Sequence, residues 1–178
     1  KAKNANLQRY AEAFSFLQSK KLYTVDDLET TLHAMQNKID TLKKSASAKQ
    51  ARIKEVDELL RMARYYVDGK PVADKLRSIR FEKSRQKYKS ELEDSLRTFY
   101  MAERKLKLHF KDGKLPITAW RREREQLDQE YKDIQTELSP LYADAKKLWA
   151  IHYNIYEVQH EQERQNAATR QKKQEIER

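Results

Sequence analysis

The strongest chemical signal in this sequence is a run of basic residues with aromatic residues between them. Residues 75–89 contain seven bases and a single acid, Glu82. Bases neutralise phosphates and an exposed ring stacks on a nucleobase, so such a run suits nucleic acid. The candidate residues for binding nucleic acid or an acidic partner are Lys75, Arg77, Arg80, Phe81, Lys83, Arg85, Lys87, Tyr88 and Lys89. Three interpretations stay open: contact with nucleic acid, contact with an acidic protein, or a solvated surface whose aromatic residues are buried.

The other residues that carry chemistry do not form catalytic or metal-binding patterns. The four histidines are scattered, and His33 and His152 fall on or beside helix seams, where packing is the simpler role. A tyrosine nucleophile needs a nearby metal or base, and neither accompanies the ten tyrosines. With no cysteine and two glycines, the chain has no thiol chemistry and no glycine-rich phosphate loop. We therefore expect no catalytic residue, metal or cofactor, and no enzyme activity in this segment.

Composition predicts an all-α protein. The chain has 178 residues, of which 37% are charged, and only two glycines and three prolines. Sheets need many tight turns that use glycine and proline, so β-rich folds are excluded. The longest apolar run, Leu148–Ile151, is far too short to cross a membrane, and we expect no membrane insertion. The absence of cysteine fits a reducing cytoplasm, and a start at Lys1 suggests a piece of a longer protein.

Two heptad seams, which are stripes of core positions spaced alternately three and four residues apart, organise the chain. Thr24 is the predicted N-cap of the first long helix, which we expect to end at the Asp68–Pro71 stretch. Its seam consists of Val25, Leu28, Leu32, Met35, Ile39, Leu42, Ala46, Lys49, Ile53, Val56, Leu60, Ala63 and Val67. The second seam consists of Trp120, Leu127, Tyr131, Ile134, Leu138, Leu141, Ala145, Leu148, His152 and Ile155. Pro140 lies inside it and predicts a kink or a lost backbone hydrogen bond.

The two seams predict an elongated antiparallel helical hairpin or coiled coil with a small helical insert at its tip. Parallel self-association of one seam is the competing arrangement. Glu123, Glu130 and Glu137, one heptad apart, are expected to be solvated flanks of the second helix. The expected parts are an N-terminal packing helix (1–23), a first long coiled-coil helix (24–68), a basic helical insert (69–115), a second long helix (116–160) and a polar C-terminal helix end (161–178).

The formal charge of +10 is unevenly distributed. Residues 1–24 carry five bases and one acid, and residues 68–115 carry fourteen bases and eight acids. The remaining residues nearly balance. The first helix and the insert therefore hold the excess positive charge, which indicates an anionic partner for one of them.

Several segments resemble the C-terminal helical region of relaxases, the mobilization nucleases of Gram-positive conjugative elements. The resemblance covers roughly residues 5–155 and rests on the order of its segments. They are Leu7–Leu17, Tyr23–Leu28, the Lys70–Val72 turn, the basic tyrosine-containing insert, and Lys114–Thr118 at the start of the last long helix.

The resemblance implies a non-catalytic module of a DNA relaxase that acts in conjugative plasmid or transposon transfer. In that family a separate N-terminal domain carries the metal site and the nucleophilic tyrosine, and no such residue can be matched here. The implied roles are DNA binding at the transfer origin, relaxosome assembly, or recruitment by type IV secretion and coupling proteins. The alternative is a coiled-coil scaffold or adaptor that binds only protein partners or a second copy of itself.

Overall fold

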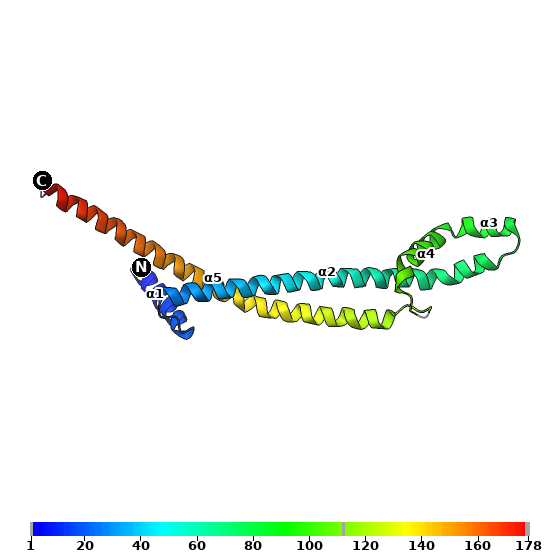
Figure 1. Ribbon diagram of the computed structural model, residues 1–178, viewed down its shortest axis with the longest axis horizontal. Helices are drawn as coiled ribbons and strands as arrows, with labels where there is room; N and C mark the ends of the chain where they lie inside the picture. The colour runs from blue at the N-terminus through cyan, green and yellow to red at the C-terminus, as the bar shows by residue number, and fades with distance from the viewer. Residues whose placement is uncertain (1, 112, 177–178) are drawn as a thin grey trace. The chain divides into compact units, whose positions relative to one another are not determined.

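The computed structural model describes residues 2–111 and 113–176, and this part of the chain is all-α. Of the described residues, 91% are helical. In chain order the elements are α1 (Ala2–Ser19), α2 (Val25–Ser78), α3 (Glu82–Glu91), α4 (Glu93–Leu106), a 3₁₀ turn η1 (Lys107–His109) and α5 (Ile117–Ile176) (Figure 1). They divide between two compact units, residues 1–44 with 135–178 and residues 45–134.

The entrance to α2 is capped as the sequence predicts. The backbone N–H of Asp27 donates to Oγ1 of Thr24 at 3.0 Å, and the backbone N–H of Thr24 donates to the Asp27 carboxylate at 3.0 Å. This reciprocal arrangement satisfies two backbone donors that a helix start leaves unpaired. The hydrogen bond with Thr24, followed by one from the Tyr23 backbone, lowers the pKa of Asp27.

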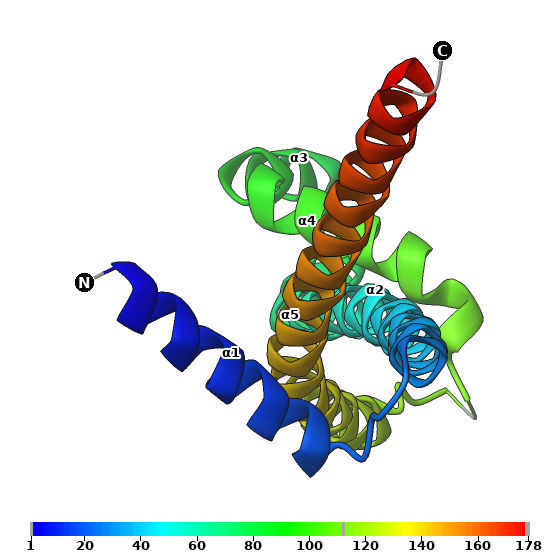
Figure 2. The same ribbon diagram turned by 90° about the vertical axis from the view of Figure 1, so that its left-hand side faces the viewer.

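In the first unit, α1, the start of α2 and the middle of α5 share one small core. Leu22, Leu28, Leu32 and Leu148 are buried together, and Leu17 and Ile151 pack against them. Lys20, just after α1, pairs with Asp144 of α5, and Figure 2 shows α1 beside α5. Across α2 and α5 the unit has ion pairs Lys38–Glu137 and Glu29–His152. Because residue numbers rise along one helix as they fall along the other, the two helices are antiparallel here.

In the second unit, α2 and α5 are again antiparallel and enclose the larger core with α4. Val56, Met62, Ala63, Ala102, Leu106 and Trp120 form one buried cluster. Ala73, Leu76, Leu96 and Phe99 form another between α2 and α4. Arg52 pairs with Glu123 at 2.7 Å and Arg124 pairs with Asp57 at 3.1 Å.

Both predicted seams are confirmed over most of their length. Every predicted position from Val25 to Ala63, and every one from Trp120 to Ile155, is buried or half-buried. The three glutamates predicted as solvated flanks instead pair with bases of α2: Glu123 with Arg52, Glu130 with Lys49, and Glu137 with Lys38. The flanks of α5 therefore contribute to the pairing of the helices as well as to solvation.

The predicted end of the first long helix is wrong. Helix α2 continues through Gly69 and Pro71 to Ser78, and Val67 is 52% exposed. The buried positions shift to Gly69, Ala73 and Leu76, with Tyr66 half-buried beside them, because beyond Ala63 the helix packs against α4. Burial of this second stripe offsets the cost of proline inside a helix.

The loop predicted before the last helix is confirmed, and the polar C-terminal segment remains helical. Lys111 and Lys114 exchange two backbone hydrogen bonds of 2.9 Å, with Gly113 in the left-handed region at φ 74°. Helix α5 runs without interruption through Pro140 to Ile176. Proline has no N–H to donate at that point, so the predicted loss of one backbone hydrogen bond follows from its chemistry.

Candidate nucleic-acid interface

The nine candidate residues lie together in the second unit, where the chain passes from the end of α2 to α3. Lys75 and Arg77 occupy the last turn of α2, and Arg80 and Phe81 lie in the connection. Lys83, Arg85, Lys87, Tyr88 and Lys89 are on α3. Because α2 continues to Ser78, these residues span a helix end, a short connection and a second helix.

Arg85 of α3 connects this helix to the end of α2. Its Nε and Nη2 atoms donate to the backbone carbonyl of Ile79 at 3.2 and 2.7 Å. The last carbonyls of a helix lack intrahelical partners, so the guanidinium satisfies a group that the end of α2 leaves open. Phe81 has an extended backbone, φ −83° and ψ 123°, and its carbonyl accepts the first hydrogen bond of α3 from Arg85 at 2.9 Å. Arg85 therefore positions α3.

Three further candidates are engaged within the protein. Lys75 Nζ lies 5.2 Å from the centre of the Tyr88 ring, and Tyr88 packs at the edge of the cluster containing Leu96 and Phe99. Arg77 pairs with Asp74 at 3.4 Å and with Glu103 of α4 at 3.5 Å. These contacts bind the last turn of α2 to α3 and α4.

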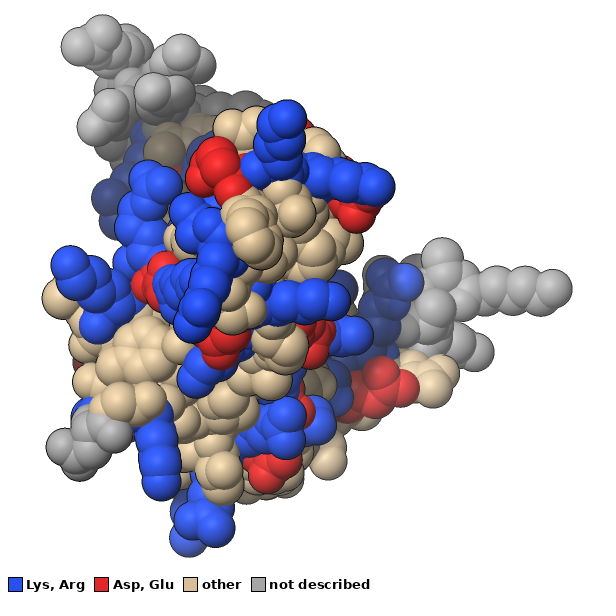
Figure 3. Space-filling view, turned by 90° about the vertical axis from the view of Figure 1, so that its right-hand side faces the viewer, with Lys and Arg blue, Asp and Glu red and all other residues tan. Residues whose placement is uncertain are grey.

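The other candidates face solvent, and we call Arg80, Phe81, Lys83, Lys87 and Lys89 the tip patch. Arg80, Lys83 and Lys89 form no hydrogen bond or ion pair with any residue that the structure describes. Lys87 has a single long contact, 4.0 Å to Glu91. Phe81 is 78% exposed. Figure 3 views the structure from this end, and Lys and Arg side chains predominate over acidic ones on the visible surface.

The tip patch can attract a polyanion and stack on a planar group. Each unpaired cation can contact a phosphate without first breaking an internal ion pair. The exposed Phe81 ring adds an apolar face beside them. Of the two aromatic residues predicted to take part, only Phe81 is placed for such contact.

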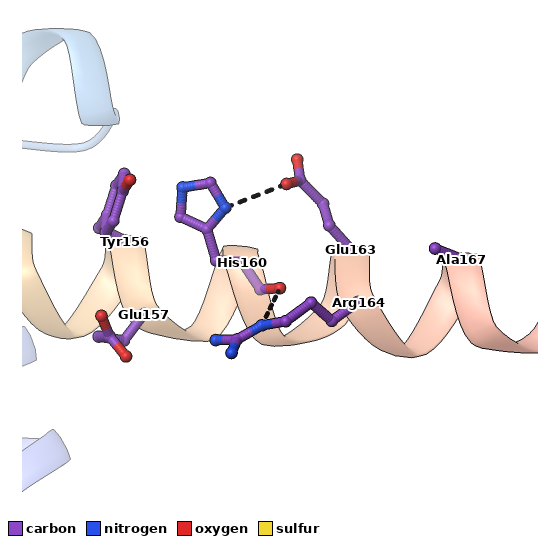
Figure 4. A pocket seen from close by; sticks show the side chains of 6 residues that line it. All are labelled: Tyr156, Glu157, His160, Glu163, Arg164 and Ala167. Atoms are coloured by element: carbon purple, nitrogen blue, oxygen red, sulfur yellow. Dashed lines mark hydrogen bonds and ion pairs between the residues drawn. The ribbon is translucent and has the colours of Figure 1, made fainter.

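A shallow, open pocket lies along α5, and its side chains differ from those of the tip patch. Tyr156, His160 and Glu163 follow one another along one face of the helix, with His160 Nδ1 3.2 Å from the Glu163 carboxylate (Figure 4). Arg164 Nε donates to the backbone carbonyl of His160 at 3.2 Å. All these groups come from one helix and stay open to solvent. Within the described residues, no three His, Cys, Asp or Glu side chains are grouped to hold a metal ion.

An exposed apolar surface on the outer side of α4 and η1 was missed by the sequence interpretation. Leu108 is 93% exposed, and Tyr100 and Met101 are 38% and 40% exposed. The available signal was spacing: Leu96, Phe99 and Leu106 lie on the buried stripe of α4, and Leu108 falls off it. A leucine outside the stripe predicts an apolar group in solvent.

Comparisons of the chain with protein-family models, curated proteins and solved structures returned no match. Function must therefore be argued from the chain's own surfaces. No helix in the described part of the chain has the length and hydropathy needed to cross a bilayer.

Proposed function

We propose that this chain is a non-catalytic helical module that binds the phosphate backbone of DNA through its tip patch. The observation that carries the proposal is the group of three cations, Arg80, Lys83 and Lys89, which have no partner among the described residues and lie near the exposed Phe81 in the chain. Some other bases of the second unit, such as Arg52, Lys105 and Arg124, are committed to ion pairs, and the remaining unpaired ones do not have Phe81 next to them in the chain. Unpaired bases are the ones available to an anionic partner.

The chemistry of the patch favours contact with phosphates over recognition of sequence. Lysine binds phosphate as a point charge, only Arg80 has the planar fork that suits a guanine edge, and the patch has no asparagine or glutamine for adenine. Binding should therefore be independent of sequence and strongly dependent on salt, because each phosphate contact releases condensed counterions.

The proposal extends to the biological setting through the resemblance to relaxases. A DNA-binding tip on a helical module would help to hold the transfer-origin DNA or assemble the relaxosome in a bacterial cytoplasm. Recruitment by type IV secretion or coupling proteins would use other surfaces of the same module. This setting rests on the resemblance, and the binding proposal rests on the tip patch.

The experiment compares two variants that each lose three positive charges. The tip variant is Arg80→Gln, Lys83→Gln and Lys89→Gln. The control variant is Lys54→Gln, Arg121→Gln and Arg122→Gln, which removes exposed bases without described partners from α2 and α5 of the same unit. Fluorescence anisotropy with a labelled duplex should show weakened binding for the tip variant and a much smaller change for the control. Equal losses would mean that only net charge matters, and the tip patch would not be a site.

A protein-only scaffold is the second candidate, and one observation favours it. Tyr10 and Phe14 of α1, one turn apart, are each 62% exposed beside Ile155 and Val158 of α5, around a cavity of about 610 Å³. Exposed aromatic residues of this kind mark protein interfaces. Sedimentation equilibrium distinguishes a monomer from a self-associated form, and Phe14→Ser should abolish association if this surface forms it.

A further inference from the structure

The exposure of Leu108 is fixed by the residues around it. Leu106 is fully buried, the His109 ring meets Trp120 edge-on at 5.7 Å, and the Phe110 ring meets Tyr66 at 5.3 Å. The 3₁₀ turn is therefore anchored on both sides of Leu108. Among the described large hydrophobic residues, Leu108 has the highest exposure, 93%. A single exposed leucine is ordinary on a protein surface, so Leu108 is informative only together with the other exposed side chains around it.

Leu108 belongs to a larger surface along α4. Met101 and Arg104 lie three residues apart on α4 and so share one side of that helix, and Leu108 follows in the 3₁₀ turn directly after the helix ends. Tyr100 is the exposed residue before Met101, and Lys107 is the exposed residue before Leu108. We call Tyr100, Met101, Arg104, Lys107, Leu108 and Lys111 the α4 outer surface. The opposite side of α4 is buried through Leu96, Phe99, Ala102 and Leu106.

The bases of this surface are available. The side chains of Arg104, Lys107 and Lys111 form no hydrogen bond or ion pair with any described residue. The acid nearest in sequence within α4, Glu103, is occupied by Arg77 at 3.5 Å, and Lys105 is occupied by Glu58 at 3.0 Å. The α4 outer surface thus combines unpaired positive charge with projecting apolar side chains.

Nucleic acid fits this combination poorly. Phosphates would satisfy the cations, but an aliphatic side chain can be buried in DNA only by unstacking bases, which costs more than one leucine gains. A bilayer with anionic lipids offers both requirements at once: negative headgroups for the bases and an apolar layer beneath them. Tyrosine side chains are also enriched at the level of the lipid headgroups.

We propose that the α4 outer surface adsorbs on an anionic phospholipid bilayer, with Leu108 and Met101 dipping between headgroups. The contact is peripheral and needs no spanning helix. It is independent of the DNA proposal, since it uses neither Phe81 nor any base of the tip patch. The three bases, which have no partner among the described residues, are complementary in charge to anionic headgroups. This complementarity favours an anionic bilayer as the partner.

Vesicle co-sedimentation tests the proposal. The probes are phosphatidylcholine vesicles with and without about 30 mol% phosphatidylglycerol, a composition that gives a negative surface potential. Wild-type protein should bind only the anionic vesicles. Arg104→Gln with Lys107→Gln and Lys111→Gln should weaken partitioning about a hundredfold, at about fivefold per base. Leu108→Ser, which leaves the charge unchanged, should weaken it about tenfold.

The tip variant is the matched control because it also loses three charges. It should bind anionic vesicles nearly as well as wild type, and Leu108→Ser should bind duplex DNA as well as wild type. Circular dichroism confirms that each variant remains helical. If Leu108→Ser binds vesicles as tightly as wild type, or if both triple variants lose vesicle binding equally, adsorption is merely charge-driven and the proposal is wrong. If the three outer-surface substitutions weaken DNA binding and leave vesicle binding intact, the surface is a nucleic-acid site instead.

Discussion

Gly69 of α2 lies against Phe99 of α4 so closely that a Cβ atom on Gly69 would be 2.7 Å from the Phe99 Cβ. Gly69 is buried in the middle of a continuous helix, where glycine is normally unfavourable. The missing side chain allows α2 and α4 to approach, and the Phe99 ring stacks on Tyr66 at 5.3 Å. This contact fixes the part of the second unit that carries α3.

Gly69→Ala should destabilise the protein despite the better helix propensity of alanine. The clash involves Cβ of Phe99, close to the backbone, so relief requires α2 and α4 to separate. We expect a net loss of about 1–2 kcal/mol, since overpacking typically costs about 1–3 kcal/mol and propensity returns part of it. Urea denaturation measures the change. Asp68→Ala, at the neighbouring exposed position, should change stability by less than about 0.5 kcal/mol. An unchanged or raised urea midpoint for Gly69→Ala would show that the close approach of Gly69 and Phe99 does not make alanine destabilising.

The same glycine shows where sequence reasoning succeeds and where it fails. The seams from Val25 to Ala63 and from Trp120 to Ile155 are predictable because heptad spacing is a local property of the chain. The Asp68–Pro71 stretch carries local stop signals, yet the helix continues because Ala73 and Leu76 are buried against a helix that follows later in the chain. The same holds for the candidate site. Composition located its bases, but the roles of Arg85 and Tyr88 depend on contacts with Ile79 and Lys75 that no spacing rule supplies.

Lys49 is the single charged residue of the predicted first seam and pairs with Glu130 of α5. Its side chain is 26% exposed, so the charge is held at the edge of the interface. Lys49→Leu should stabilise the unit by about 1 kcal/mol through added apolar burial. A charged core position also restricts alternative pairings, so the variant should self-associate more strongly. Thermal unfolding and sedimentation velocity measure the two effects. A less stable variant would show that the ion pair outweighs apolar packing.

The Lys49–Glu130 pair also predicts a pH dependence. The hydrogen bond with Lys49, and next the one with Gln126, lowers the pKa of Glu130 from its usual value of 4.5. A depressed carboxyl pKa stabilises the folded state above the unfolded pKa, and this contribution is lost as the pH falls through the folded pKa. The stability difference between wild type and Glu130→Gln should therefore be constant at neutral pH and should shrink below about pH 4.5. Urea midpoints measured at a series of pH values check this. If the stability difference between wild type and Glu130→Gln persists at the lowest pH, it does not arise from ionisation of Glu130.

Arg85→Lys should loosen α3 without changing the net charge. Lysine cannot reproduce the two hydrogen bonds from the guanidinium to the Ile79 carbonyl. Loss of about 1 kcal/mol should accelerate amide hydrogen exchange in α3 about fivefold. Arg97→Lys is the matched control, because among the described residues Arg97 pairs with Asp94 alone, on the exposed side of α4. Equal exchange in both variants would contradict a positioning role for Arg85.

The central claim is that Arg80, Lys83 and Lys89 bind phosphates, and the salt dependence of duplex DNA binding tests it most directly. Each phosphate contact contributes about 0.9 to the slope of log K against log salt concentration. The account predicts that the tip variant has a slope shallower than wild type by about 2.7, since three contacts are removed. The variant with Lys54, Arg121 and Arg122 replaced should keep the wild-type slope. A tip variant whose slope and affinity match those of wild type would contradict the claim.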